Sequence, residues 1–121
     1  MDKWQIIDSF WNIFGVPAYD ESSVPDDAGF PRITYQVATG SLSDTLPMTA
    51  SIWYANSRWP EVSQLAERIG EHIGLGGVML PCDDGAVWIQ RGIPFAQRMS
   101  DPTDDTIRRI VLQITAEFIT S

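Results

Sequence analysis

The sequence predicts an α+β domain in which two helices pack on one face of a mostly antiparallel β-sheet. Two segments carry apolar residues at the three- and four-residue spacing of an amphipathic helix, whereas most other patterned segments alternate with a period of two. The segments follow one another in the order α-β-β-α-β-β-(β)-β. The length of 121 residues corresponds to a single domain spanning residues 1–121.

The first helix is expected over residues 3–14, with Asp2 as its cap and a stop at Gly15 and Pro17. Its apolar stripe consists of Trp4, Ile7, Phe10, Trp11 and Phe14. Residues 15–31 hold three prolines and four acidic residues without periodicity, which predicts a long loop. A loop of this length in a small domain is usually functional or disordered.

The next segments alternate like strands. Residues 32–37 form the first predicted strand, and residues 48–55 form the second after a turn with the sequence GSLSDTLP. The second helix is predicted over residues 59–73, because one stripe is apolar and Pro60 lies within the first turn, where proline is tolerated. That stripe consists of Val62, Leu65, Ala66, Ile69 and Ile73.

The last third of the chain is predicted to be β-structure. Residues 78–80 and 86–91 flank an Asp84-Gly85 turn and are expected to form a hairpin, and residues 95–99 form a possible short strand. Residues 107–119 fit both a helix and a strand. Their β-branched content favours the strand.

Composition limits the classes of partner. Sixteen acidic and eight basic residues give a net charge of −8 and a pI near 4.3. Affinity for phosphate comes from Lys and Arg, so neither a sequence-specific nucleic acid nor a membrane is expected as a partner. Five Trp and five Phe exceed what one small core can hold, which favours aromatic protein interfaces. A single cysteine and the lack of a signal peptide or long apolar run predict a soluble cytosolic protein.

The segment PFAQRMSDPTDDTIRRI, residues 94–110, is the strongest candidate for a functional site. Its charged residues are Arg98, Asp101, Asp104, Asp105, Arg108 and Arg109. The acids lack the every-second-residue spacing, glycine and terminal Glu of a calcium-binding loop, so no metal site is expected. An Asp-Pro turn feeding the last strand explains them better.

Catalytic chemistry finds no support in the sequence. The single histidine, His72, lies at the edge of an apolar stripe, and Cys82 precedes an aspartate that disfavours a thiolate. The glycines of GLGGV follow a helix instead of preceding one, so they do not form a phosphate-binding loop. We therefore expect no enzyme activity, no catalytic residue, no cofactor and no metal.

Three stretches of the chain resemble a known family. They are FPRITYQV (30–37), TASIWYANSRWPEVSQLAERIGEHIG (49–74) and WIQRGIPFAQRMSDPTDDTIRRIVLQITAEF (88–118). Together they resemble the tail terminator, or tail completion, proteins of tailed bacteriophages and prophages of Gram-positive bacteria, and the likeness covers most of the chain. The motifs are S-x-W-Y at a strand end, W-x-E-V-x-x-x-A-E-x-I at a helix start and R-M-S-D-P-x-D-D-T-I-R-R before the last strand.

This resemblance implies a structural virion protein with a compact α+β fold. Such proteins form a hexameric ring on the tail tube, stop its polymerisation and join it to the head. The implied partners are further copies of the chain, the tail tube protein and a head-completion or connector protein. The implied location is the head-tail junction of the virion, after a period in the host bacterial cytoplasm.

A ring contact joins two different patches of neighbouring subunits. We expect the charged segment to fix its register, with the aspartates or the acidic 20–27 loop facing arginines of a neighbour or of the tail tube. Trp59 is the best candidate for an exposed aromatic. The predicted interface residues are Trp59, Arg98, Asp101, Asp104, Asp105, Arg108 and Arg109. A small acidic inhibitor that mimics DNA, or another neck or tail accessory protein, is the alternative function.

Overall fold

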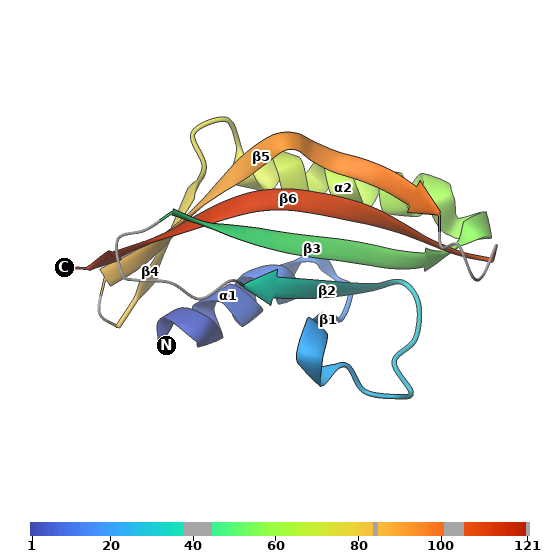
Figure 1. The fold of residues 1–121 in the computed structure, drawn as a ribbon, viewed down its shortest axis with the longest axis horizontal. Coiled ribbons are helices and arrows are strands. Elements are labelled where there is room, and N and C mark those ends of the chain that lie inside the picture. Colours follow the sequence, from blue (N-terminus) through green and yellow to red (C-terminus); the bar gives the residue numbers. More distant parts are fainter. Residues whose placement is uncertain (38–44, 84, 101–105, 121) are drawn as a thin grey trace.

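The computed structural model describes residues 1–37, 45–83, 85–100 and 106–120. The protein is an α+β domain with two helices and a curled, six-stranded, mostly antiparallel sheet (Figure 1). The helices are α1 (Lys3–Trp11) and α2 (Trp59–Ile73). The strands are β1 (Ala18–Asp20), β2 (Arg32–Val37), β3 (Thr45–Ala55), β4 (Val78–Cys82), β5 (Gly85–Ser100) and β6 (Ile107–Thr120).

The strands lie in the order β1-β2-β3-β6-β5-β4. All neighbours are antiparallel except β1 and β2, which are parallel. The last strand of the chain, β6, therefore lies between β3 and β5 in the middle of the sheet. Its prediction as a strand is confirmed, and its buried residues alternate with less buried ones because successive side chains of a strand point to opposite faces. The buried members are Ile110, Leu112, Ile114, Ala116 and Phe118.

The predicted order of elements is wrong in two places. The expected loop over residues 15–31 contains β1 and a short 3₁₀ helix, and the expected strand at residues 95–99 is the continuation of β5. Strand β1 has only three residues, which are too few to show an alternating pattern of apolar and polar residues in the sequence. The side chain of Asn12 instead supports β1, because it bonds both the N–H and the C=O of Ala18. In β5, a register shift between Arg91 and Ala96 interrupts the alternation.

The helices agree with their predicted positions, with one difference in α1. Asp2 accepts a hydrogen bond from the Gln5 N–H, and the Gln5 side chain bonds back to the Asp2 N–H. The α-helix ends at Trp11, and a 3₁₀ turn (Asn12–Phe14) completes the predicted segment. The next residue, Gly15, has a φ of 83°, a conformation that favours glycine.

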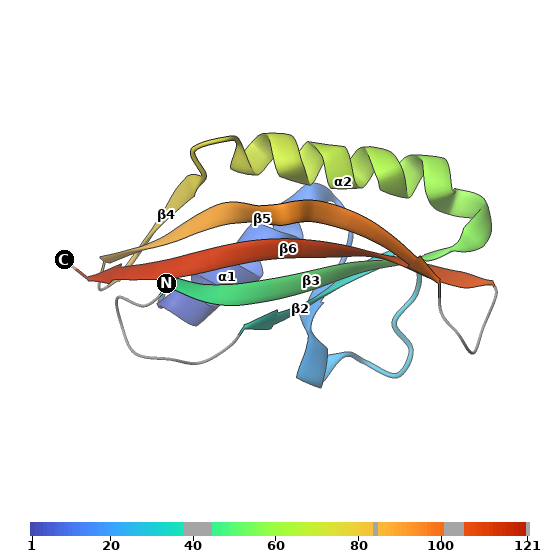
Figure 2. The same cartoon turned by 45° about the horizontal axis from the view of Figure 1, so that its top comes forward.

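Aromatic side chains of α1 contact aromatic side chains of β6 and β2. Trp4 meets Phe118 edge-on at 5.8 Å between ring centroids, and Trp11 stacks on Tyr35 at 6.4 Å. Figure 2 shows α2 lying lengthwise beside the sheet, where its apolar stripe is buried as predicted. Burial of this stripe removes apolar surface from water, which is the main force holding α2 to the strands.

Tyr35 connects β2 to α1 and should make stability sensitive to alkaline pH. Its hydroxyl donates a 2.6 Å hydrogen bond to Asp8 Oδ1. Burial, and then the Asp8 carboxylate, raise the pKa of Tyr35 above its ordinary value. Folding thus favours the protonated phenol. The associated stability is complete below about pH 10, the ordinary pKa of tyrosine, and is lost as the pH rises above it.

We therefore expect the free energy of unfolding to fall less above about pH 10 in Tyr35→Phe than in the unchanged chain. At neutral pH the same substitution should cost about 1 kcal/mol, because it removes one hydrogen bond. Urea denaturation over a pH series measures both effects. Tyr19→Phe, on the neighbouring strand, is the control, and an identical alkaline profile for Tyr35→Phe and the unchanged chain would contradict the prediction.

Candidate docking surface

A row of basic and aromatic side chains crosses one end of the sheet. Trp53 of β3 is paired with Arg32 of β2 on one side and with Arg109 of β6 on the other. Arg109 is in turn paired with Met99 of β5. Directly paired residues point to the same face of a sheet. These four residues, which we call the cross-strand row, therefore share the face opposite the buried side chains of β3 and β6.

The cross-strand row is held by contacts to its own aromatic rings. The Arg109 guanidinium lies 5.2 Å from the Trp53 ring centroid, and Arg109 Nη2 lies 4.0 Å from Met99 Sδ. The Trp53 indole N–H donates to Thr34 Oγ1 at 2.9 Å, which fixes the ring. Cation–π contacts of this kind are worth about 0.5–1 kcal/mol at exposed sites. They orient a guanidinium without neutralising it.

Arg32, the member of the cross-strand row that belongs to β2, also contacts an aromatic ring. The Arg32 guanidinium lies 4.5 Å from the Phe30 ring centroid, and Arg32 Nη1 donates to the Ala28 carbonyl at 3.0 Å. The acidic loop over residues 20–27 precedes this anchor in the chain. Figure 1 shows the segment that contains these acidic residues leading from β1 to the start of β2, where Arg32 begins the basic row.

Arg98 and Trp59 form a second pair at this end. Arg98 is paired with the buried Ile110, so it lies on the α2 side of β5. Its guanidinium is 5.2 Å from the Trp59 ring centroid and donates to Ser63 Oγ at 2.9 Å. Trp59 is 50% exposed, which confirms the prediction of an exposed aromatic at the start of α2.

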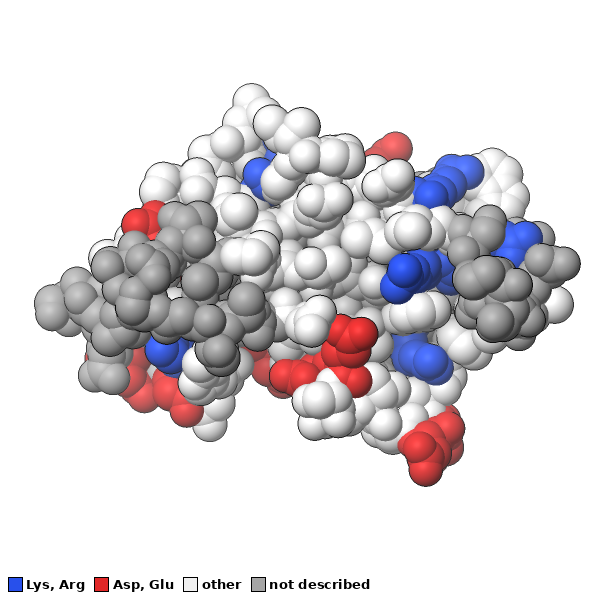
Figure 3. Space-filling view, viewed as in Figure 1, with Lys and Arg blue, Asp and Glu red and all other residues white. Residues whose placement is uncertain are grey.

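Positive charge gathers where β5 ends and β6 begins, although the whole chain carries −8 (Figure 3). Among the described residues, the ion pairs join the Met1 amine to Asp83 and Arg58 to Glu61. Three other arginines contact aromatic rings and form no ion pair with a carboxylate of the described residues. They are Arg32, Arg98 and Arg109. A guanidinium that has no carboxylate partner within its own chain can form bidentate hydrogen bonds with a carboxylate of another protein.

The structure brings some of the predicted interface residues together. Trp59 contacts Arg98, and Arg109 joins the cross-strand row. Arg108 is paired with Tyr54, and its Nη1 donates to the Ile107 carbonyl at 3.1 Å. The three predicted acids, Asp101, Asp104 and Asp105, lie outside the described residues.

Sequence reasoning missed Arg32, Trp53 and Met99 as members of the surface. One signal was available for Trp53. It alternates with Ile52 and Tyr54, both buried, so the period of two places it on the opposite face. The neighbours of Trp53 across the sheet depend on strand register, which one sequence does not reveal.

The described residues hold no group of three or more His, Cys, Asp or Glu side chains placed to bind a metal ion. Within the same residues, no helix has the length and apolar character needed to cross a membrane. No family model matches the chain, and no curated protein matches its sequence.

Proposed function

We propose that the chain is a structural assembly protein and not an enzyme, and that it acts as a phage tail terminator. In this role a ring of copies, six by the family resemblance, caps the tail tube and joins it to the head in the virion. The observation that carries the proposal is the set of three guanidiniums, of Arg32, Arg98 and Arg109, held against rings without carboxylate partners among the described residues. Oriented but unneutralised charge suits docking.

The proposal includes the arrangement of the layers. Both helices pack on one face of the sheet, and the other face is left for partners of the cross-strand row, whereas Arg98 and Trp59 meet partners from the helix side. The contacts of Trp4 with Phe118 and of Trp11 with Tyr35 support this arrangement for α1, because strand register places Tyr35 and Phe118 on the same face. For α2 the support is its ring contact with α1, where the ring centroids of His72 and Phe10 lie 5.8 Å apart. The cross-strand row then lies on the open face.

The partner surface is acidic protein, supplied by a neighbouring copy or by the tail tube protein. A net charge of −8 opposes close approach to DNA phosphates, whereas aromatic and arginine side chains are the residues enriched at protein interfaces. The acidic loop over residues 20–27 of a neighbouring copy has the complementary charge. Such contacts fix orientation and association rate more than affinity.

Arg109→Glu and Arg98→Glu test the proposal, because each reverses one charge of the docking surface. Like charges facing each other cost several kcal/mol, so joining of tails to heads should fall at least about tenfold. The measurements are the yield of joined particles in a reconstitution with tail tubes and filled heads, and ring formation by electron microscopy. Arg68→Glu, the same charge change on an exposed part of α2, is the matched control.

Both variants should keep the fold, because surface substitutions usually change stability by less than about 0.5 kcal/mol. Far-UV circular dichroism checks this. Normal joining by both Arg109→Glu and Arg98→Glu would rule out this docking surface. A stable monomer that inhibits a nuclease, with no effect on tails, would favour the DNA-mimic alternative instead.

A further inference from the structure

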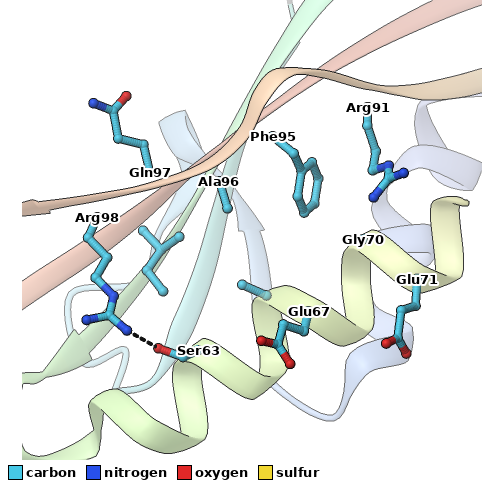
Figure 4. A pocket seen from close by; sticks show the side chains of 11 residues that line it. Ser63, Glu67, Gly70, Glu71, Arg91, Phe95, Ala96, Gln97 and Arg98 are labelled. Carbon is cyan, nitrogen blue, oxygen red and sulfur yellow. Dashed lines mark hydrogen bonds between the residues drawn. The ribbon is translucent and has the colours of Figure 1, made fainter. Parts of the chain in front are cut away.

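A hollow of about 410 Å³ lies between α2 and β5 (Figure 4). Its lining is apolar at Ala66, Phe95, Ala96 and Ile110. The hollow is open to solvent along α2. An apolar, concave site with charged groups around it is the usual form of a binding site.

An irregularity in β5 builds both the hollow and a projection beside it. Between the pairs Arg91 with Ile114 and Ala96 with Leu112, β5 has residues 92–95 where β6 has Gln113 alone. The extra residues form a bulge, which re-aims side chains. Phe95 turns toward α2, where a Cβ on Gly70 would lie 3.0 Å from its ring. Ile93 turns outward and is 98% exposed.

The two walls of the hollow carry opposite charges. Arg91 and Arg98 lie on the β5 wall, and Glu67 and Glu71 lie on the α2 wall (Figure 4). In the described part of the chain, none of these four side chains forms an ion pair with another residue. Each wall therefore presents charge that a partner of opposite charge can neutralise.

We propose that two copies of this chain associate through the hollow about a two-fold axis. In such a contact the same patch of both subunits must complement itself. The patch is complementary to itself in shape, because Ile93 projects beside an apolar hollow that can receive the Ile93 of the other copy. It is also complementary to itself in charge, because a two-fold rotation places the basic β5 wall of one copy over the acidic α2 wall of the other.

The two-fold contact shares only Arg98 with the docking surface proposed above, because Arg98 also lines the hollow. It uses Ile93, Arg91, Glu67 and Glu71, none of which belongs to the cross-strand row. It also joins two like patches, whereas a ring contact joins two unlike ones. The pair of copies is therefore a state of the free protein, and it is measured without tails or heads.

Ile93→Asp is the first test, with sedimentation equilibrium and native mass spectrometry of the full chain over a concentration range. The unchanged chain should form dimers, and Ile93→Asp should weaken dimerisation at least about tenfold, because it places a charge in an apolar hollow. Met79→Asp, at an exposed apolar residue of β4, should dimerise like the unchanged chain. Arg109→Glu should also leave dimerisation unchanged.

A charge exchange keeps the proposal testable if Ile93→Asp fails to fold. Arg91→Glu and Glu71→Arg should each weaken self-association, and an equimolar mixture of the two variants should restore it as a mixed dimer. Restoration requires that the two walls face each other across the contact. An unchanged chain that stays monomeric throughout the range, or variants that all dimerise normally, would overturn the proposal.

Discussion

Trp11→Ala is expected to lower the free energy of unfolding by about 3–5 kcal/mol, the usual cost of removing a large buried aromatic side chain. Trp11 is fully buried, with an exposed fraction of 0%. Its ring contacts Phe10, Phe14 and Tyr35 at centroid distances of 5.0, 6.5 and 6.4 Å. It therefore joins α1 to the sheet, and its loss leaves a cavity that both elements line.

Urea denaturation followed by circular dichroism at 222 nm, a wavelength that reports helix, measures this cost. Trp11→Phe is the matched control, because it keeps an aromatic ring in the site. The Trp11 indole N–H has no hydrogen-bond partner in the described part of the chain. Trp11→Phe therefore removes no hydrogen bond and should cost less than Trp11→Ala. Trp59→Ala, at a half-exposed position, should cost less again. Equal costs at positions 11 and 59 would contradict the burial of Trp11.

Helix α2 shows how far local pattern alone can determine an element. Its predicted bounds, residues 59–73, agree with the structure because the apolar stripe, Pro60 in the first turn and the following glycines all indicate one segment. Strand β6 is harder, since Ile110, Ile114 and Phe118 lie on one side in either a helix or a strand. Its β-branched residues decide the question locally. Its place between β3 and β5 adds the pairing that no local pattern contains.

The features that sequence reasoning missed depend on distant parts of the chain. β1 is only three residues long and exists because Asn12 and β2 satisfy its backbone groups. The bulge in β5 is fixed by β6, because a Cβ on Gly92 would lie 2.9 Å from the Gln113 carbonyl oxygen. Neither contact leaves a period or a motif in one sequence.

The candidate docking surface could also be predicted only in part. The sequence indicates Trp59 by its position at a helix start, and Arg98, Arg108 and Arg109 by their position in a charged segment. The sequence does not indicate that Arg32, Trp53 and Arg109 lie in one row, because the registers of β2, β3 and β6 bring them together. Residue type therefore predicts which side chains are candidates for docking, and strand register determines which of them lie next to one another.

Gly77→Ala is expected to destabilise the fold by about 3 kcal/mol or more, because two independent penalties combine. Gly77 has a φ of 82°, which costs an alanine roughly 1–2 kcal/mol. A Cβ at this position would also lie 2.6 Å from the Ile89 carbonyl oxygen and 2.6 Å from Trp88 Nε1. The carbonyl belongs to the backbone of β5 and cannot move aside without disturbing the sheet.

The neighbouring residue supplies a matched control one position away in the same loop. Gly76→Ala should change the free energy of unfolding by less than about 1 kcal/mol, because a Cβ on Gly76 meets no atom within 4 Å. The Trp88 indole N–H donates to the Gly76 carbonyl at 3.1 Å, and this bond holds the loop against β5. Gly77→Ala displaces that indole, so it should also change the tryptophan environment seen by near-UV circular dichroism. Equal effects of the two substitutions on stability would show that this loop does not approach β5 as closely as the structure places it.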